Sequence, residues 1–286
     1  MAGPTPDARP TPATRPAPTA RLNGEPVDAG RLLSLALTGY GLVTSMRVEA
    51  GRVRGLGLHL DRLASDCRTL FGAELDRERV RDLARRATAT LPPGGTGVVR
   101  ITVFDPGLDL AHPAASCADG EPQVLVSTRP APAVPSSPIR VQTRRFVRDL
   151  PGVKSVGLFG QLVHRREAQL AGYDDALFVS ESVDGGAHVS EGGTWNVGFV
   201  DADGTVVWPD ADVLECVTMR LLQRAHPHVV RPVPQAEVTG LRAAFATNAA
   251  VGVRAIRAID DTTLSVDDPV IDGLRQAYLD LPADPL

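Results

Sequence analysis

The sequence predicts an α+β fold in two lobes. Segments typical of strands and of helices are mixed along the chain, without the regular alternation that a parallel α/β sheet needs. At 286 residues the chain exceeds one typical domain and falls short of three. Residues 128–138 read TRPAPAVPSSP, a composition typical of a linker. We therefore expect a smaller N-terminal α/β lobe over residues 27–128, a linker over 129–138 and a larger C-terminal lobe over 139–286.

The first 26 residues consist mainly of Pro, Ala, Thr and Arg. Such a segment cannot bury enough apolar surface to order itself. Its proline density also opposes the amphipathic helix of a transit peptide. We expect a disordered tail over residues 1–26.

In the N-terminal lobe, an apolar segment is broken by the turn at residues 38–41 and continues as a strand, Thr44–Val48. Residues 58–71 carry apolar side chains at the spacing of one helix face, and Gly72 follows as a stop signal. A second helix is expected from Asp76 to about Leu91. Two strands, Val98–Phe104 and Val124–Ser127, are expected on either side of a loop over 106–122.

The C-terminal lobe shows one strong hairpin signal. Asp201-Ala202-Asp203-Gly204 joins two apolar runs, Trp195–Val200 and Thr205–Trp208. Helices are expected at Val156–Ala171, Glu215–Ala225 and Asp268–Leu279, and further strands at Ile139–Thr143, Ala176–Ser180 and Val251–Ile256.

Composition excludes several classes of function. The net charge of −4 gives no reason to expect nucleic acid. The apolar stretches are well short of the roughly 20 residues that a membrane-spanning helix needs. Three separated cysteines, Cys67, Cys117 and Cys216, indicate neither a disulfide framework nor a metal site. A reducing cytoplasm fits this cysteine usage best.

Lys154 is the only lysine among thirty basic Lys and Arg residues. Arginine stays protonated and serves surface and ion-pair roles, whereas a desolvated lysine amine can lose its proton and form a Schiff base with a carbonyl. The count alone fits a chance survivor of an arginine-favouring composition equally well. Lys154 lies between a strand and a helix start, where a side chain is positioned by both and open to a cleft.

A carboxylate, Glu191, follows on a glycine-bearing turn just before an apolar strand. Pyridoxal phosphate enzymes need such an acid, because a carboxylate against the ring nitrogen keeps it protonated. A lone Glu before two glycines is usually only a turn residue. Paired with the sole lysine 37 residues earlier (191 − 154 = 37), it becomes a candidate for this role.

The chain resembles the class IV, fold-type IV pyridoxal phosphate enzymes, which include branched-chain aminotransferases, D-amino acid aminotransferases and 4-amino-4-deoxychorismate lyases. The resemblance runs from about Val27 to Asp260. Five segments carry it: Gly39–Val48 is similar to a Gly-Asp-Gly-x-aromatic segment, His59–Leu63 to HxxRL, Val153–Ser155 to the Schiff-base lysine segment, Glu191–Asn196 to EGSxSN, and Val217–Arg220 to GxTR.

The resemblance implies a two-lobed D-amino acid aminotransferase-like fold, a homodimer and pyridoxal 5′-phosphate as cofactor. It assigns Lys154 to the Schiff base and to general base catalysis, and Glu191 to the ring nitrogen. The other implied cofactor-binding residues are Arg62, Asn196, Val217, Thr218, Thr247 and Asn248. A helix N-terminus and a guanidinium both suit a phosphate. Without the motifs, Arg62 would be taken for a solvated helix-face residue and Thr218 for a helix cap; His59 is interpreted as structural.

Departures from the family pattern leave the reaction open. Gly157-Leu158-Phe159 replaces a common Asn-Tyr pair, Tyr40 an aspartate, Trp195 a small residue, and Glu215-Cys216 a common Pro-Gly pair. Thr44 and the Thr-Asn-Ala at 247–249 resemble the lyases, and Ala249 lacks a hydroxyl that aminotransferases aim at the phosphate.

We expect an aminotransferase that moves an amino group from an amino acid or amine donor to a 2-oxo acid acceptor. The alternative is a lyase that forms p-aminobenzoate and pyruvate from 4-amino-4-deoxychorismate. A second alternative is a catalytically silent protein that keeps the fold for binding. Five arginines are candidates for gripping a substrate carboxylate: Arg47, Arg100, Arg144, Arg145 and Arg148.

Overall fold

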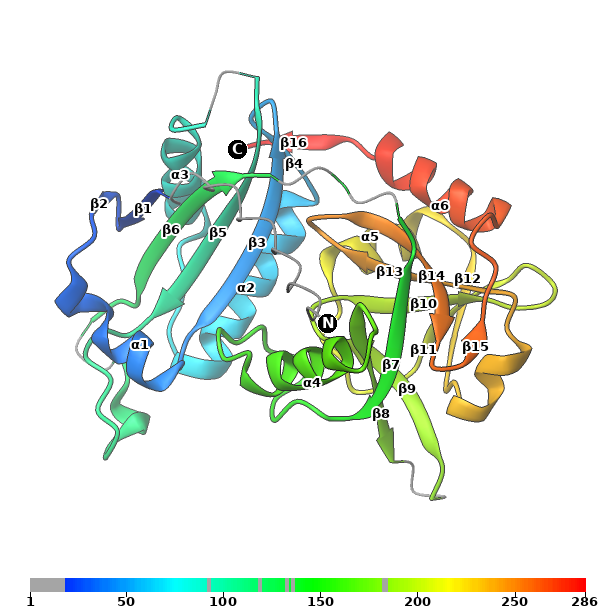
Figure 1. The fold of residues 1–286 in the computed structure, drawn as a ribbon. Helices are drawn as coiled ribbons and strands as arrows, with labels where there is room; N and C mark the ends of the chain where they lie inside the picture. The colour runs from blue at the N-terminus through cyan, green and yellow to red at the C-terminus, as the bar shows by residue number, and fades with distance from the viewer. Residues whose placement is uncertain (1–18, 92–93, 118–119, 132–133, 135–136, 182–184) are drawn as a thin grey trace, which may run out of the picture.

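Two lobes lie side by side, each built on its own β-sheet (Figure 1). The computed structural model describes residues 19–286 except 92–93, 118–119, 132–133, 135–136 and 182–184. Helices and strands mix in both lobes, so the α+β fold class predicted from the sequence is confirmed.

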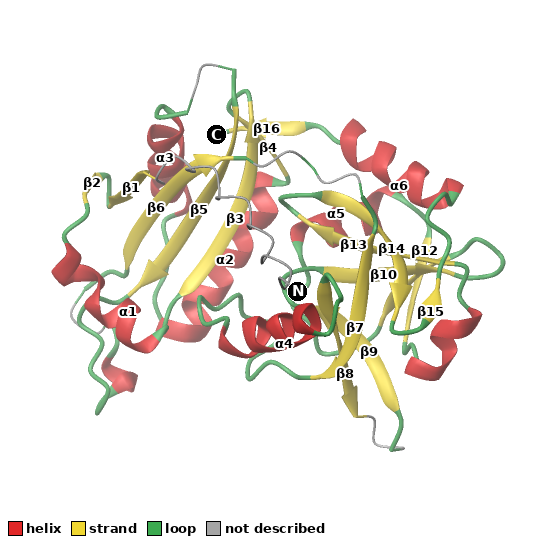
Figure 2. Cartoon of the chain, viewed as in Figure 1, coloured by secondary structure: helices red, strands yellow, loops and turns green. Residues whose placement is uncertain are grey.

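The N-terminal lobe holds a seven-stranded sheet in the order β16-β4-β3-β5-β6-β1-β2. Its strands are β1 (Thr19–Leu22), β2 (Glu25–Pro26), β3 (Leu42–Glu49), β4 (Arg52–Arg54), β5 (Thr96–Phe104), β6 (Gln123–Pro130) and β16 (Ala283–Pro285). The helical segments are η1 (Ala29–Leu32), α1 (Leu33–Thr38), α2 (Leu56–Phe71), α3 (Arg77–Thr88) and η2 (Pro113–Ala115). Helices α2 and α3 cover one face of the sheet (Figure 2), where they share a core with Leu42, Met46 and Val48 of β3.

Local sequence sets the ends of these helices. Gly55 and Gly72 flank α2 in the left-handed region, at φ 69° and 63°, a conformation that favours glycine. The Asp76 side chain accepts the backbone N–H groups of Glu78 and Arg79 and so caps α3. Both predicted helices are therefore confirmed.

The C-terminal lobe holds a nine-stranded sheet, ordered β12-β11-β10-β13-β14-β7-β8-β9 with β15 beside β14. Its strands are β7 (Ile139–Arg145), β8 (Asp175–Glu181), β9 (Ala187–Gly192), β10 (Asn196–Val200), β11 (Val206–Pro209), β12 (His228–Arg231), β13 (Ala243–Asn248), β14 (Gly252–Ile259) and β15 (Thr262–Thr263). The helices are α4 (Phe159–Leu170), α5 (Val217–Ala225), η3 (Gln235–Gly240) and α6 (Pro269–Asp280). The hairpin predicted around residues 201–204 joins β10 and β11.

Three boundaries differ from the sequence prediction. Residues 1–18 of the expected tail lie outside the described residues, but residues 19–26 form β1 and β2, because β1 adds to the edge of the sheet beside β6. The predicted linker is shorter at its start, since Arg129 and Pro130 still pair with β5. Residues 132–133 and 135–136 of that linker lie outside the described residues.

The third difference concerns the C-terminus, which was predicted to belong entirely to the C-terminal lobe. After α6 the chain crosses to the other lobe, where β16 pairs with β4 and Leu286 enters the core beneath α2 and α3. Two hydrogen bonds reinforce the crossing, from Arg52 Nε to the Ala283 carbonyl (2.8 Å) and from Leu286 N to the Gly51 carbonyl (3.0 Å).

No helix in the described part of the chain is long and apolar enough to cross a membrane.

Candidate active site

Lys154 lies against the edge of β3 that faces the C-terminal lobe. The backbone N–H of Val43 donates to the Lys154 carbonyl (2.9 Å), and Val156 N–H donates to the Gly41 carbonyl (2.9 Å), so Leu42 and Ser155 form an isolated antiparallel bridge. At the other end of β3, Glu49 pairs with Arg52 of β4. Among the described residues, the stretch of this edge between these two pairings has no neighbouring strand, and it opens towards the C-terminal lobe.

This pairing decides which way the lysine faces. Residues opposite each other in an antiparallel pair project from the same face, so Lys154 shares a face with Val43. Val153, one residue earlier, joins the core under α2 on the other face. The Asp66 carboxylate on α2 accepts the Lys154 backbone N–H (3.0 Å) and holds this segment against α2.

The amine of Lys154 is desolvated and surrounded mainly by positive charge. Burial lowers its pKa to about 8, with further lowering from Arg62 and Arg148; Cys216 and Glu191 oppose the shift. An amine with this pKa is partly neutral near pH 7, which is the form that adds to a carbonyl. The lysine therefore has the protonation behaviour that Schiff-base chemistry needs.

Glu191 and Asn196 face each other across a tight hairpin. Glu191 lies in β9 rather than on the turn predicted for it, and the turn follows at residues 193–195. The register pairs Glu191 with Asn196 of β10, and both side chains are buried. Gly192 is needed here, because a Cβ on it would lie 2.0 Å from the Trp195 ring.

The Glu191 carboxylate is ion-paired with Arg148, a partner that the sequence reasoning missed. Burial raises the pKa of Glu191, while Arg148, the Leu214 N–H and Lys154 act in the opposite direction. Arg148 lies six residues before Lys154 (154 − 148 = 6), in the stretch between β7 and α4. One loop thus supplies both the lysine and the cation that holds the acid.

The start of α5 presents free backbone donors to the same site. Cys216 is the N-cap, and its Sγ accepts the Met219 N–H at 3.3 Å. The N–H groups of Val217 and Thr218, the first two helical residues, have no acceptor within the helix. Both residues are buried, as a phosphate-binding role requires.

Arg62 approaches these donors from α2. Its Nη1 donates to the Glu215 carbonyl (3.3 Å) and its Nη2 to Thr44 Oγ1 (3.1 Å). Thr44 is also 2.7 Å from Nδ1 of the buried His59. This contact supports the structural role predicted for His59 and shows that the Thr44 hydroxyl is directed at α2.

Three buried polar atoms in this region make no hydrogen bond of normal geometry with the described residues: Arg62 Nε, Asn196 Nδ2 and Thr218 Oγ1, which has the Tyr278 hydroxyl as a neighbour. Buried polar groups are rarely left without a partner. All three belong to residues predicted to bind the cofactor. Two donors and a hydroxyl beside the start of α5, together with a desolvated amine and a carboxylate, fit a phosphate-bearing aldehyde with a basic ring nitrogen.

Two residues predicted to bind the cofactor lie on β13 and face opposite sides of the strand. Thr247 is buried at the site, with Oγ1 3.3 Å from the Asn196 carbonyl and 3.6 Å from Cys216 Sγ. Asn248 faces away, because side chains alternate along a strand. Its Oδ1 accepts the N–H groups of Ala250 and Val251 at 3.0 Å and so holds the turn after β13, and cofactor binding by Asn248 stays a prediction.

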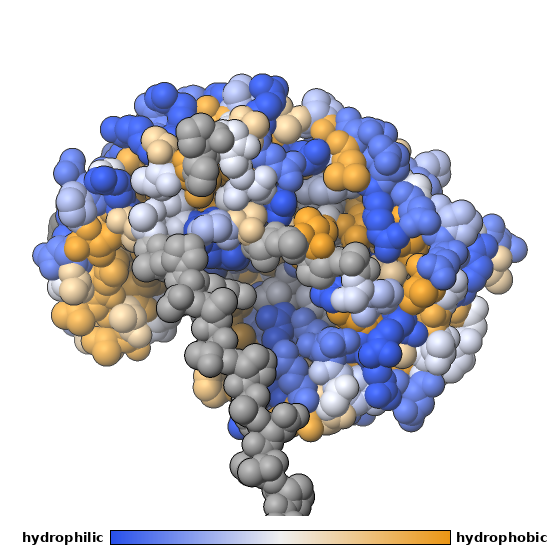
Figure 3. Space-filling view, turned by 45° about the horizontal axis from the view of Figure 1, so that its top comes forward, coloured by the Kyte–Doolittle hydropathy of each residue, from blue (hydrophilic) through white to orange (hydrophobic). Residues whose placement is uncertain are grey.

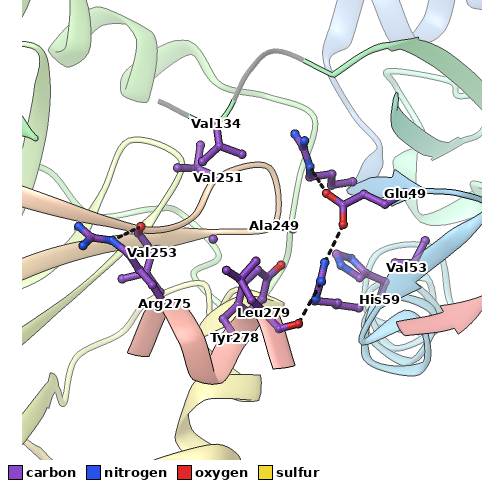
Figure 4. Close-up of a pocket in the computed structure, with 13 residues that line it drawn as sticks. Glu49, Val53, His59, Val134, Ala249, Val251, Val253, Arg275, Tyr278 and Leu279 are labelled. Atoms are coloured by element: carbon purple, nitrogen blue, oxygen red, sulfur yellow. Dashed lines mark hydrogen bonds and ion pairs between the residues drawn. The ribbon is translucent and has the colours of Figure 1, made fainter. Parts of the chain in front are cut away.

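Two cavities border the cluster. One, of about 650 Å³, is lined by charged residues that include Arg62, Asp66 and Glu215. The other, of about 140 Å³, lies between the lobes and reaches His59 and Ala249 (Figure 4). The first cavity reaches the phosphate side of the cluster at Arg62, and Lys154 itself lines neither cavity.

The two-sheet fold and the motifs around the lysine are those of the fold-type IV class. The sequence matches the model of the amino-transferase class IV family over residues 41–259, which is most of the chain. The chain belongs to the class IV aminotransferase family, and pyridoxal 5′-phosphate, the cofactor expected from the sequence, is the cofactor of that family. A comparison with curated protein sequences finds no significant match.

Solved structures share the fold at low sequence identity. The branched-chain amino acid aminotransferase of T.th., complexed with N-(5′-phosphopyridoxyl)-L-glutamate, is 21% identical with a TM-score of 0.77, over 91% of this chain and 92% of that one. A fold IV transaminase from Curtobacterium pusillum is 25% identical (TM-score 0.70, over 86% and 85%). A hypothetical aminotransferase from Mycobacterium tuberculosis in its PLP-bound form is 19% identical (TM-score 0.71, over 88% and 91%).

Proposed function

We propose that this protein is a pyridoxal 5′-phosphate-dependent aminotransferase that moves an amino group from an amino acid or amine to a 2-oxo acid. The observation that carries this proposal is the desolvated amine of Lys154, held within electrostatic reach of Glu191 and Arg62. When bound, the cofactor supplies an aldehyde that joins primary amines and a protonated ring that accepts electrons from the substrate Cα.

Each residue of the cluster has one task in this proposal. Nζ of Lys154 would hold the cofactor through its aldehyde carbon, and as a free amine it would take the proton from the substrate Cα. The Glu191 carboxylate keeps the ring nitrogen protonated, and Arg148 keeps that carboxylate ionised. Arg62, the N–H groups of Val217 and Thr218, and the Thr218 hydroxyl hold the phosphate, with Asn196 and Thr247 supporting the start of α5.

Of the five arginines considered for the substrate carboxylate, Arg100 is the best supported. The other four already have side-chain partners. Arg148 pairs with Glu191 and Arg145 pairs with Glu181. Arg144 contacts Gln142 and Glu167, and Arg47 pairs with Glu49. The Arg100 side chain makes no hydrogen bond or ion pair with the described residues, and burial and the nearby Arg129 lower its pKa. It is opposite Ser45 in the sheet, and Ser45 is on the same face as Val43 and therefore as Lys154.

Borohydride reduction of the cofactor-saturated protein, followed by peptide mass analysis, tests the proposal. We expect a pyridoxyl adduct on Lys154 and none on a Lys154→Arg variant. An unmodified Lys154 would remove the enzyme assignment and leave the catalytically silent binding protein.

The lyase alternative uses the same residues and is separated by its products. A transaminase converts the bound cofactor to the pyridoxamine form with a panel of amino acids and amines, and a 2-oxo acid reverses the change. Release of pyruvate from 4-amino-4-deoxychorismate without an oxo-acid acceptor would identify the lyase. Thr44, the lyase-like residue on β3, is engaged by Arg62 and His59, which favours the transaminase.

A homodimer is part of the proposal. Leu33 and Leu37 on α1 are 57% and 80% exposed, and Phe159 and Leu162 on α4 are 84% and 52% exposed. Hydrophobic residues gather over the α1 end of the N-terminal lobe in Figure 3. Large exposed apolar surfaces mark interfaces. Sedimentation velocity should give a dimer that Phe159→Glu dissociates and that a Leu110→Glu control, at a similarly exposed position, leaves intact; a monomeric wild type would contradict this part of the proposal.

A further inference from the structure

Helix α2 presents a stripe of three polar residues to the lysine site. His59, Arg62 and Asp66 are three and four residues apart (62 − 59 = 3; 66 − 62 = 4), the spacing of one helix face. His59 Nδ1 and Arg62 Nη2 both contact the Thr44 hydroxyl, at 2.7 and 3.1 Å. The Asp66 carboxylate accepts the Lys154 backbone N–H at 3.0 Å. The stripe therefore borders both β3 and the lysine.

Asp66 is the only acid among the buried residues of α2, a helix that the structure describes throughout. It is 4% exposed. Burying a carboxylate costs free energy, and burial accordingly raises the pKa of Asp66. A neutral acceptor would satisfy one backbone N–H without this cost. The charge of Asp66 must therefore act on something other than the N–H.

Two cationic side chains lie within electrostatic reach of the Asp66 carboxylate, those of Arg62 and Lys154. Both lower the pKa of Asp66 and so oppose the effect of burial. The Arg62 guanidinium donates to the Glu215 carbonyl and to Thr44, and its Nε makes no hydrogen bond of normal geometry with the described residues. Asp66 thus attracts Arg62 without occupying the donor that a phosphate would take.

The backbone of Lys154 is held on both sides. Its N–H donates to Asp66, and its carbonyl accepts the Val43 N–H at 2.9 Å. Val153 anchors the preceding residue in the core under α2. With the backbone fixed, the amine can move only by rotation of its own side chain. Loss of the Asp66 contact would release the N–H side of this arrangement.

We infer that Asp66 is a positioning residue: its carboxylate holds Lys154 by the backbone N–H and attracts Arg62 by its charge, and so aligns the amine with the phosphate-binding side of the site. This inference rests on the proposed function, in which Lys154 and Arg62 bind the same cofactor. Asp66 acts through these two residues and has no contact of its own with the reacting atoms.

The test uses the fact that Lys154 is the only lysine of the chain. Isotopically labelled lysine therefore gives one backbone amide signal and one side-chain signal in the NMR spectrum of the cofactor-free protein. Exchange of the amide proton reports the hydrogen bond to Asp66. The side-chain signal reports the titration of the amine, whose pKa is about 8. The other charged or titratable groups that face the amine stay in place in every variant: His59 and Arg62 on α2, Arg148 in the loop before Lys154, Glu191 on β9 and Cys216 at the start of α5.

Two substitutions separate the charge of Asp66 from its hydrogen bond. Asp66→Asn keeps an acceptor for the Lys154 N–H and removes the charge, whereas Asp66→Ala removes both. In both variants the amine should titrate at lower pH than in the wild type, because it has lost a nearby anion. Only Asp66→Ala should exchange the Lys154 amide faster, by at least about tenfold.

Asp61→Asn is the matched control. Asp61 is an acid of the same helix and lines the same large cavity as Asp66, but it is exposed and pairs with Arg77. The substitution makes the same change of charge without touching the lysine segment. It should leave both the amide exchange and the amine titration as in the wild type. A shift of the titration as large as that of Asp66→Asn would overturn the inference.

Capture of pyridoxal phosphate by the cofactor-free protein tests the positioning itself. Above about pH 9 most of the amine is neutral in every variant, so the capture rate reaches a plateau that no longer depends on titration. We expect Asp66→Ala to lower this plateau by at least about tenfold and Asp66→Asn to keep most of it. An unchanged plateau in Asp66→Ala, or an amine titration in Asp66→Asn equal to that of the wild type, would also contradict the inference.

Failure of the proposed function would give a different result. If the wild type captures no pyridoxal phosphate, the transaminase proposal fails by itself, and the amide exchange and amine titration still decide whether Asp66 acts on Lys154. If Asp66→Ala does not fold, the titration of Asp66→Asn compared with Asp61→Asn decides the same question.

Discussion

The Arg148 guanidinium and the Glu191 carboxylate form an ion pair in which the two side chains are only 9% and 5% exposed. Removing one partner of a buried pair leaves an uncompensated charge, which typically costs about 3–5 kcal/mol. We therefore expect Arg148→Met to lose stability in this range at neutral pH, measured by urea unfolding. The double variant Arg148→Met/Glu191→Gln should recover most of it; an equal loss in both variants would show that the pair is not the cause.

The loss should also depend on pH. Without Arg148, desolvation acts on Glu191 unopposed by its main counterion, and the pKa of the acid rises further above its ordinary value. A group whose folded-state pKa is raised contributes stability at low pH that is lost as pH rises through the folded pKa. The unfolding free energy of Arg148→Met should therefore be closest to that of the wild type in acid, and it should drop further below it as pH increases.

The depressed pKa of Lys154, about 8, predicts how the cofactor-free protein captures pyridoxal phosphate. Only the neutral amine adds to the aldehyde, so the capture rate should rise about tenfold per pH unit below the pKa and level off by about pH 9. An ordinary lysine would still gain rate at about pH 10. Stopped-flow absorbance gives this profile, and Lys154→Arg provides the baseline.

The phosphate role of Arg62 is tested against another arginine of the same helix. Arg62→Leu removes a half-buried guanidinium whose Nε is buried without a partner, whereas Arg68 is half-exposed and pairs with Glu74. Charge-assisted hydrogen bonds contribute about 1.5–3 kcal/mol each. Equilibrium dialysis should show at least about tenfold weaker cofactor binding for Arg62→Leu and no change for Arg68→Leu. Equal effects would rule out a specific phosphate contact.

Arg100 predicts a dependence on the substrate carboxylate. Arg100→Leu should raise KM for amino acid donors by about ten- to a hundredfold and leave simple amines, which have no carboxylate, unaffected. Arg145→Leu, at an exposed position paired with Glu181, should change neither. Equal loss of activity with amines and amino acids would argue that Arg100 acts on the fold and not on the substrate.

The C-terminal crossing predicts that deleting a few C-terminal residues destabilises the N-terminal lobe. Removing residues 283–286 exposes the edge of β4 and takes Leu286, 8% exposed, out of the core under α2. Burying such a side chain stabilises by about 1.5–3 kcal/mol. We expect the deletion to lower the free energy of unfolding by at least this amount, measured by thermal unfolding, and Leu286→Ala to lower it by less. An Asp284→Asn control, at an exposed position of β16, should behave like the wild type.

The parts of the site that the sequence predicted are those built by local structure. Val217 and Thr218 open a helix whose periodicity and start are readable, and the Glu191–Asn196 spacing is that of a hairpin. Arg62 was assigned from the resemblance of His59–Leu63 to HxxRL, on a helix whose apolar face and glycine stop are readable in the sequence. In each of these cases a few neighbouring residues determine the orientation of the side chain.

The residues that escaped prediction depend on tertiary contacts. Arg148 lies in a loop without periodicity, so nothing local pairs it with Glu191. The side of β13 on which Asn248 lies could not be read from the sequence, because the strand is rich in alanine and shows no alternation from which to tell its two faces. Strand β16 has three residues and ends in proline, too short to give a pattern before its partner strand is known.

The pairing of β16 with β4 has a consequence for how the protein is made. Ribosomes release a chain from its N-terminus, and domains generally fold in that order as they emerge. Here the first lobe lacks an edge strand and the Leu286 side chain until residues 283–286 have been synthesised. A nascent chain would therefore carry an unprotected sheet edge, and truncated translation products would be especially prone to aggregate.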